Sequence, residues 1–130
     1  MSTCGLDTSV VLRLLVGVPE DQAQRALDAV QQCSQRQIKV CVSDLVIQET
    51  YHALLHHYHV PIQEAVECLL DFLSSGVITG TGHAMSVLQE FSGSGPGVAD
   101  RLIRKGYLDQ ASTVLTFDAR FARLPNMKKL

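Results

Sequence analysis

The stretch IKVCVSDLVIQETYHALLHHY, residues 38–58, decides the expected fold class. Its first five residues are mostly β-branched or apolar, which predicts a buried strand. Ser43 follows at once and is a favourable N-cap, so we expect a helix from there to about Tyr58. A buried strand that leads directly into a helix is typical of parallel sheets, because parallel strands need a long crossover.

The same alternation continues on both sides of this stretch. The sequence predicts strands at 2–6, 76–79 and 113–117, helices at 10–15, after Pro19, after Pro61, at 84–91 and at 98–110, a loop at 93–97, and a last helical turn at 118–124. Helical spacing places Ala23, Ala26, Leu27, Val30 and Cys33 inward on the second helix, and Ile62, Val66, Leu69, Leu70 and Leu73 inward on the helix after Pro61. These segments predict a single three-layer α/β/α domain over residues 1–130, built around a mostly parallel central sheet.

Composition excludes several classes of protein. Hydrophobic residues make up 46% and charged residues 18% of 130 residues, which excludes a disordered chain and fits one domain. No apolar run reaches membrane-spanning length and no basic, apolar leader is visible, so we expect no membrane contact and a cytoplasmic location. The four cysteines lack zinc-site spacing and are expected to be buried, reduced thiols.

Charge is unevenly distributed along the chain. The formal net charge is −2, so a general basic surface is absent, yet seven Lys or Arg residues lie from Arg101 to the C-terminus against two acids. One interpretation is a local strip that binds phosphate groups, and the other is an ordinary mixed surface with a solvated tail. The candidate phosphate contacts are Arg13, Arg101, Arg104 and Arg120.

Two aspartates directly follow predicted strands. Asp7 follows residues 2–6, and Asp118 follows residues 113–117. Ligands of open parallel sheets bind beyond the carboxyl ends of the strands, so both side chains are candidates for one site. Aspartate is also a good helix N-cap, and this structural role is the alternative for each of them.

Two further acids stand among apolar residues. Glu49 lies in the helix after Ser43, and Asp100 opens the helix after the glycine-rich loop. Carboxylates brought together repel one another, and a divalent cation removes that repulsion. Oxygen ligands without His or Cys favour Mg²⁺ or Mn²⁺ over zinc, and such sites hydrolyse phosphodiester bonds.

The four acids stand in four short motifs, which are Gly-Leu-Asp-Thr-Ser (5–9), Val-Ser-Asp-Leu-Val-Ile-Gln-Glu (42–49), Val-Ala-Asp-Arg-Leu-Ile (98–103) and Leu-Thr-Phe-Asp-Ala-Arg-Phe (115–121). These motifs resemble those of PIN domains, and most closely those of the VapC-type toxins. The resemblance covers nearly the whole chain. It implies a nuclease that cleaves single-stranded or looped RNA with Mg²⁺ or Mn²⁺, a protein antitoxin and a homodimer.

Carried over residue by residue, the resemblance assigns the acidic set and one hydroxyl. Asp7, Glu49, Asp100 and Asp118 match the family's metal-binding and catalytic acids, and Thr116 matches a hydroxyl that often borders the site and is a candidate substrate contact. The chain departs from the family at its C-terminal end. Ala111 stands where many members have a turn glycine, Gly106 is expected to interrupt its helix, and the six residues after Leu124 predict a final edge strand that is short or missing.

Other functions stay open at this stage. A PIN-like scaffold can keep its acids and only bind, without catalysis. A different Mg²⁺-dependent phosphohydrolase is disfavoured because Asp7 is followed by Thr8 and Ser9, not by an Asp-x-Asp pair. His52 and His56 share a helix face, but without a glutamate between them they predict a polar, partly exposed face or support for Glu49.

Overall fold

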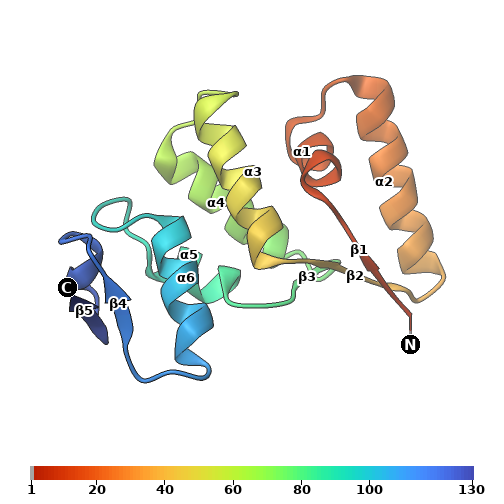
Figure 1. Ribbon diagram of the computed structural model, residues 1–130. Coiled ribbons are helices and arrows are strands. Elements are labelled where there is room, and N and C mark those ends of the chain that lie inside the picture. Colours follow the sequence, from red (N-terminus) through yellow and green to blue (C-terminus); the bar gives the residue numbers. More distant parts are fainter. Residues whose placement is uncertain (1) are drawn as a thin grey trace. The chain divides into compact units, whose positions relative to one another are not determined.

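The computed structural model describes residues 2–130 and has the predicted α/β class, with parallel strands that alternate with helices. Backbone contacts divide the chain into two compact units, one that ends at Thr81 and one that runs from Gly82 to Leu130. Figure 1 labels the elements of both. Within residues 2–130, no helix combines the length and apolar character needed to cross a membrane.

The first unit contains three strands and four helices among its described residues. They are β1 (Thr3–Gly5), α1 (Thr8–Val16), α2 (Glu20–Gln35), β2 (Lys39–Val42), α3 (Asp44–His56), α4 (Ile62–Leu73) and β3 (Ile78–Gly80). Helix α1 packs beside α2, and α3 packs beside α4 (Figure 1). The order of elements agrees with the alternation predicted from the sequence.

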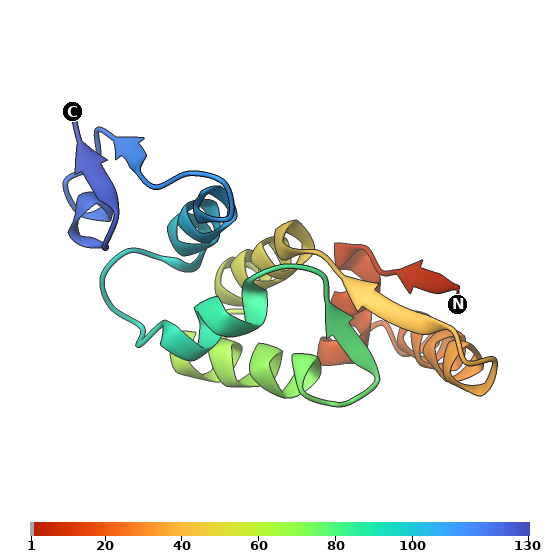
Figure 2. The ribbon, with the colours of Figure 1, turned by 90° about the horizontal axis from the view of Figure 1, so that it is seen from below.

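The sheet of this unit is parallel, with β2 between β1 and β3 (Figure 2). Cys4 pairs with Val40, and Val40 pairs with Ile78. Val40 and Val42 are 2% and 1% exposed, as the apolar run in the sequence predicted for a buried strand. Because all three strands run in the same direction, their carboxyl ends lie at the same end of the sheet.

Two helices of this unit differ slightly from the prediction. Ser43 caps α3 as expected, since its side chain accepts a hydrogen bond from the Val46 amide at 3.3 Å. On α2 the predicted inward residue Leu27 is 43% exposed, and on α4 Ile62 is 41% exposed. Ile62 lies in the exposed first turn, and α4 instead buries Ala65, which periodicity places on the same face. The four cysteines are free, as predicted, but the expectation that they are buried is wrong, because all four are partly exposed.

The second unit combines helices with a pair of short parallel strands. Its elements are α5 (Ala84–Glu90), α6 (Val98–Leu108), β4 (Val114–Thr116), the 3₁₀ turn η1 (Phe121–Arg123) and β5 (Met127–Lys129). The C-terminal strand is present and short, and pairs Val114 with Met127. The expectation that Gly106 interrupts its helix is wrong, because α6 runs through it unbroken.

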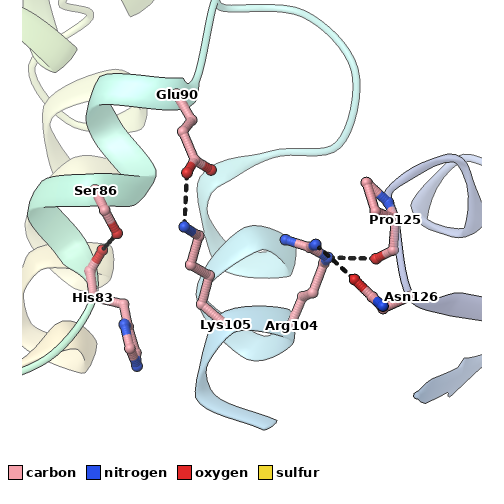
Figure 3. Close-up of polar contacts among 7 residues, drawn as sticks. All are labelled: His83, Ser86, Glu90, Arg104, Lys105, Pro125 and Asn126. Carbon is pink, nitrogen blue, oxygen red and sulfur yellow. Dashed lines mark hydrogen bonds and ion pairs between the residues drawn. The ribbon is translucent and has the colours of Figure 1, made fainter. Parts of the chain in front are cut away.

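Polar side chains of α6 contact the neighbouring elements (Figure 3). Lys105 Nζ lies 2.7 Å from Glu90 Oε1 on α5. Arg104 Nε donates to the Pro125 carbonyl at 2.7 Å, next to the start of β5. These contacts hold α6 in place, and α6 carries Asp100 in its first turn.

The glycine-rich loop before α6 is anchored by Arg101. Gly93 and Gly95 have φ values of 94° and 78°, which other residues rarely adopt. Arg101 Nε donates to the Pro96 carbonyl at 2.8 Å, and its guanidinium lies over the Phe91 ring at 5.5 Å. Arg101 therefore fixes the loop, which the sequence predicted at 93–97, against the start of α6.

Candidate active site

Asp7 stands at the carboxyl end of β1 and caps α1. Its Oδ1 accepts hydrogen bonds from Ser9 Oγ at 2.6 Å and from the Val10 amide at 3.3 Å. These hydrogen bonds, that of Ser9 above all, hold the pKa of Asp7 below its ordinary value, so the carboxylate is ionised at neutral pH. The N-cap role of Asp7 is therefore confirmed, and this role leaves the carboxylate charged and exposed at the end of a strand.

Glu49 reaches the same end of the sheet from α3. Its Oε1 accepts a hydrogen bond from Thr8 Oγ1 at 2.9 Å. Thr8 is the first residue of α1 and directly follows Asp7, so this contact fixes Glu49 beside the Asp7 turn. The expected apolar setting of Glu49 is wrong, because its side chain lies on an exposed face of α3 and finds its partner on another helix.

The cap leads to a prediction about stability. Asp7→Ala should lower the melting temperature at neutral pH, whereas Asp7→Asn should nearly preserve it, because asparagine caps helices about as well as aspartate. Since the pKa of Asp7 is lowered in the folded state, its stabilising contribution is present above the ordinary value of 3.8 and is lost as the pH falls through the folded-state pKa. Melting temperatures of both variants and of wild type, measured between pH 7 and about pH 3, test both the difference between the variants and its dependence on pH. A cap role is excluded if Asp7→Ala melts like wild type at pH 7.

Asp118 follows β4 in the second unit and organises the turn after it. Its Oδ1 accepts hydrogen bonds from the amides of Arg120 at 2.8 Å and Phe121 at 3.1 Å. Its own amide donates to Thr116 Oγ1 at 3.0 Å. Thr116 thus helps to position Asp118 by accepting a hydrogen bond from its backbone amide. The last helical turn predicted at 118–124 is a 3₁₀ turn over Phe121–Arg123 only.

Asp100 is partly buried in the first turn of α6. Burial raises the pKa of Asp100, the negative charge of Asp118 raises it further, and the Arg120 guanidinium lowers it. Asp118 and Arg120 are therefore near enough to Asp100 to act on its charge. This carboxyl has the partly desolvated setting that its apolar neighbours in the sequence predicted.

The structure brings the four predicted acids together as two pairs. Asp7 and Glu49 meet through Thr8 in the first unit, and Asp100 and Asp118 meet in the second. Over residues 2–130 there is no group of three or more His, Cys, Asp or Glu side chains placed to hold a metal ion.

The predicted histidine face is exposed, as expected. The rings of His52 and His56 lie 4.3 Å apart and are tilted by 43°. Within this unit, the hydrogen bond to Glu49 comes from Thr8 and not from either histidine. Thr8 and Ser9 were not predicted as the partners of Glu49 and Asp7, although two hydroxyl residues directly after Asp7 are a detectable signal in the sequence.

Three of the four candidate arginines have structural partners. Arg13 Nε donates to Gln22 Oε1 at 2.6 Å, at the edge of an open pocket of about 480 Å³ between β1, α1 and α2. Arg101 and Arg104 hold the glycine-rich loop and the turn before β5. Arg120 is exposed and acts on the charge of Asp100, which makes it the arginine best placed beside an acidic pair.

The geometry agrees with a family comparison. The model of the PIN domain matches residues 5–127, so the chain belongs to the PIN domain family. The match runs through both units, consistent with one α/β/α domain, and PIN domains are generally nucleases. A comparison with curated proteins found none that matches the chain.

The donor chemistry of both pairs fits a divalent metal, which PIN domains usually bind. All four side chains offer carboxylate oxygens, and Mg²⁺ is commonly held by one or two carboxylates with water in the other positions. Burial raises the pKa of Asp100 and the negative charge of Asp118 raises it further, so a cation beside this carboxyl would favour its ionised form.

Proposed function

We propose that this protein is an endoribonuclease that hydrolyses RNA phosphodiester bonds with Mg²⁺ or Mn²⁺. The observation that carries the proposal is the carboxylate pair in each unit, Asp7 with Glu49 and Asp100 with Asp118, in a chain of the PIN domain family. The four acids stand in the order of the family motifs, which supports the metal roles that the resemblance gives them. Asp7, Asp100 and Asp118 would act as metal ligands, and Glu49 would bind a second ion or orient the attacking water.

The protein's own contribution is the orientation of these carboxylates. Backbone amides fix Asp118 through Oδ1, the Ser9 hydroxyl and an amide fix Asp7 through Oδ1, and Thr8 fixes Glu49 through Oε1. Side chains held in this way need no reorganisation when the substrate arrives. When bound, the metal would stabilise negative charge on the phosphate and lower the pKa of a bound water.

The finer assignment rests on resemblance. We propose that the protein is a VapC-type toxin that acts in the cytoplasm as a homodimer and is silenced by a small protein antitoxin. The four motifs support it, since they resemble that group most closely. The neighbouring reading frames test it directly. A small antitoxin-like gene next to this one supports the proposal, and neighbours unrelated to such pairs count against it.

A cleavage assay tests the main proposal. Purified protein is incubated with a labelled single-stranded RNA in Mn²⁺, in Mg²⁺ and in EDTA, beside a preparation of Asp118→Asn purified in the same way. Cleavage by wild type that EDTA stops and that the control preparation lacks is expected. Binding of RNA without cleavage would instead indicate a silent binding module. Release of phosphate from a simple monoester with intact RNA would indicate a different phosphohydrolase.

Arg120 leads to a prediction about the substrate. Arg120→Ala should weaken RNA binding about equally for different sequences and flatten the salt dependence, because each phosphate contact on a single strand contributes about 0.7 to the slope of log K against log salt. Arg123→Ala, another exposed arginine of the same turn, is the matched control. Binding isotherms at several salt concentrations provide the measurement. A loss confined to one sequence, with an unchanged slope, would point to base recognition instead.

A further inference from the structure

Phe117 is 80% exposed, more than any other large hydrophobic side chain among residues 2–130. It stands between Thr116 and Asp118 on the turn that follows β4. Hydrogen bonds on both sides fix this turn, since the Asp118 amide donates to Thr116 Oγ1 and Asp118 Oδ1 accepts from the Arg120 amide. A flat apolar ring is therefore presented to solvent from a well-ordered backbone.

The surroundings of this ring suit a nucleic acid. The next residue is Asp118, which lies near Asp100 and, with it, forms the acidic pair of this unit. Arg120 supplies a positive charge beside the same pair. Residues 82–130 carry seven Lys or Arg against four Asp or Glu, whereas residues 1–81 carry four against nine. The unit thus combines an exposed ring with an excess of positive charge, which suits a ligand that has both flat bases and phosphates.

We propose that Phe117 is a stacking platform for one unpaired nucleobase of the RNA, adjacent to the phosphate that the acids act on. This proposal rests on the proposed function and deepens it. Bases in a duplex are already stacked on both faces, so a single exposed ring selects unpaired segments. Every base has a π face, so the contact tolerates different sequences. The ring would fix where along the strand the reacting phosphate lies, and any sequence preference would come from other residues.

The chemistry gives an expected size for the effect. Stacking of a base on an aromatic side chain contributes enough that its loss weakens binding by roughly 5-fold to 150-fold. Phe117→Ala should weaken binding of a single-stranded oligoribonucleotide within that range, and Phe117→Tyr should restore most of it. Tyr107→Ala is the matched control, because Tyr107 is an aromatic residue of the same unit that is 59% exposed. Melting curves of each variant show whether it is folded.

A double-mutant cycle, in which the change in the protein is combined with loss of a single base from the RNA, makes the test specific. Wild type and Phe117→Ala are each titrated, by fluorescence anisotropy in Ca²⁺ to limit cleavage, with an intact oligonucleotide and with copies that lack one base at successive positions. At one position, loss of the base should weaken wild type and leave Phe117→Ala unchanged, which marks direct coupling. If Phe117→Ala weakens the binding of intact RNA and of every abasic RNA by the same factor, the stacking proposal is overturned.

The outcomes separate this proposal from the function on which it rests. RNA cleavage by wild type together with unchanged binding by Phe117→Ala overturns stacking and leaves the nuclease proposal standing. Absence of RNA binding and cleavage in wild type overturns both. Unchanged RNA binding by Phe117→Ala, with loss of self-association in sedimentation, would assign the exposed ring to a protein interface and also overturn stacking.

Discussion

Asp118→Asn is expected to lower the rate of RNA cleavage by about 100-fold or more. Replacement of residues that merely support metal ligands costs 10-fold to 100-fold, so loss of a ligand's charge should cost at least as much. Asparagine keeps the side-chain oxygen that accepts hydrogen bonds from the amides of Arg120 and Phe121. The variant should therefore fold normally and lose catalysis alone.

The same result is expected for Asp7→Asn, because asparagine preserves the cap of α1 while removing the charge. Asp71→Asn provides a matched control, since Asp71 is an exposed aspartate of α4 outside the acidic pairs. Initial rates with labelled RNA in Mn²⁺ and melting curves of each variant are the measurements. If Asp7→Asn or Asp118→Asn cleaves at the wild-type rate in preparations free of contaminating nuclease, the acid concerned is not part of the site.

The second large effect concerns stability in the absence of metal. Asp100→Asn should melt at a higher temperature than wild type in EDTA at neutral pH. The pKa of Asp100 is raised in the folded protein, first by burial and then by the charge of Asp118, so the folded state disfavours the ionised form. This penalty is fully present above the folded-state pKa and disappears as the pH falls toward the ordinary value of 3.8. The advantage of the variant should shrink over the same range.

Metal should reverse the order of stability. A cation that binds the folded protein and not the unfolded chain stabilises wild type by about 2.7 kcal/mol at roughly 100 times its dissociation constant. For a domain of this size, that corresponds to a rise of about 10 °C in melting temperature. Asp100→Asn should gain much less, because it has lost a charged ligand. Melting curves of both proteins in EDTA and in millimolar Mn²⁺ make the comparison.

The same melting curves can exclude Asp100 as a metal ligand. If wild type and Asp100→Asn respond alike to Mn²⁺, and the variant is no more stable in EDTA, then Asp100 is not part of a metal site. Asp109→Asn serves as the control for the loss of an acid in the same unit. Asp109 lies 2.7 Å from His83, so its replacement should lower the melting temperature slightly and leave the response to metal unchanged.

Local features of the sequence were sufficient to predict much of this protein. The alternation of strands and helices, the cap at Ser43 and the position of Asp7 after β1 follow from periodicity and capping, which act over a few residues. Three acids of the family motifs were found in the same way, Asp7 and Asp118 directly after strands and Asp100 in the first turn of a helix, whereas Glu49 was singled out by its apolar neighbours in the sequence. These features depend on neighbours in the chain and can be read from their order.

Contacts between elements were decided only by the tertiary structure. Thr8 and Glu49 are 41 positions apart, and their hydrogen bond exists because α1 packs against α3. The pKa of Asp100 is raised first by burial and then by the charge of Asp118, which lies on the turn after β4. Helix α6 continues through Gly106, and the two residues just before it, Arg104 and Lys105, contact the turn before β5 and helix α5. The exposure of Phe117 likewise depends on which atoms surround it. Packing between distant segments sets each of these properties. The local sequence could therefore identify the acids as candidates, but it could not determine their partners or their charge state.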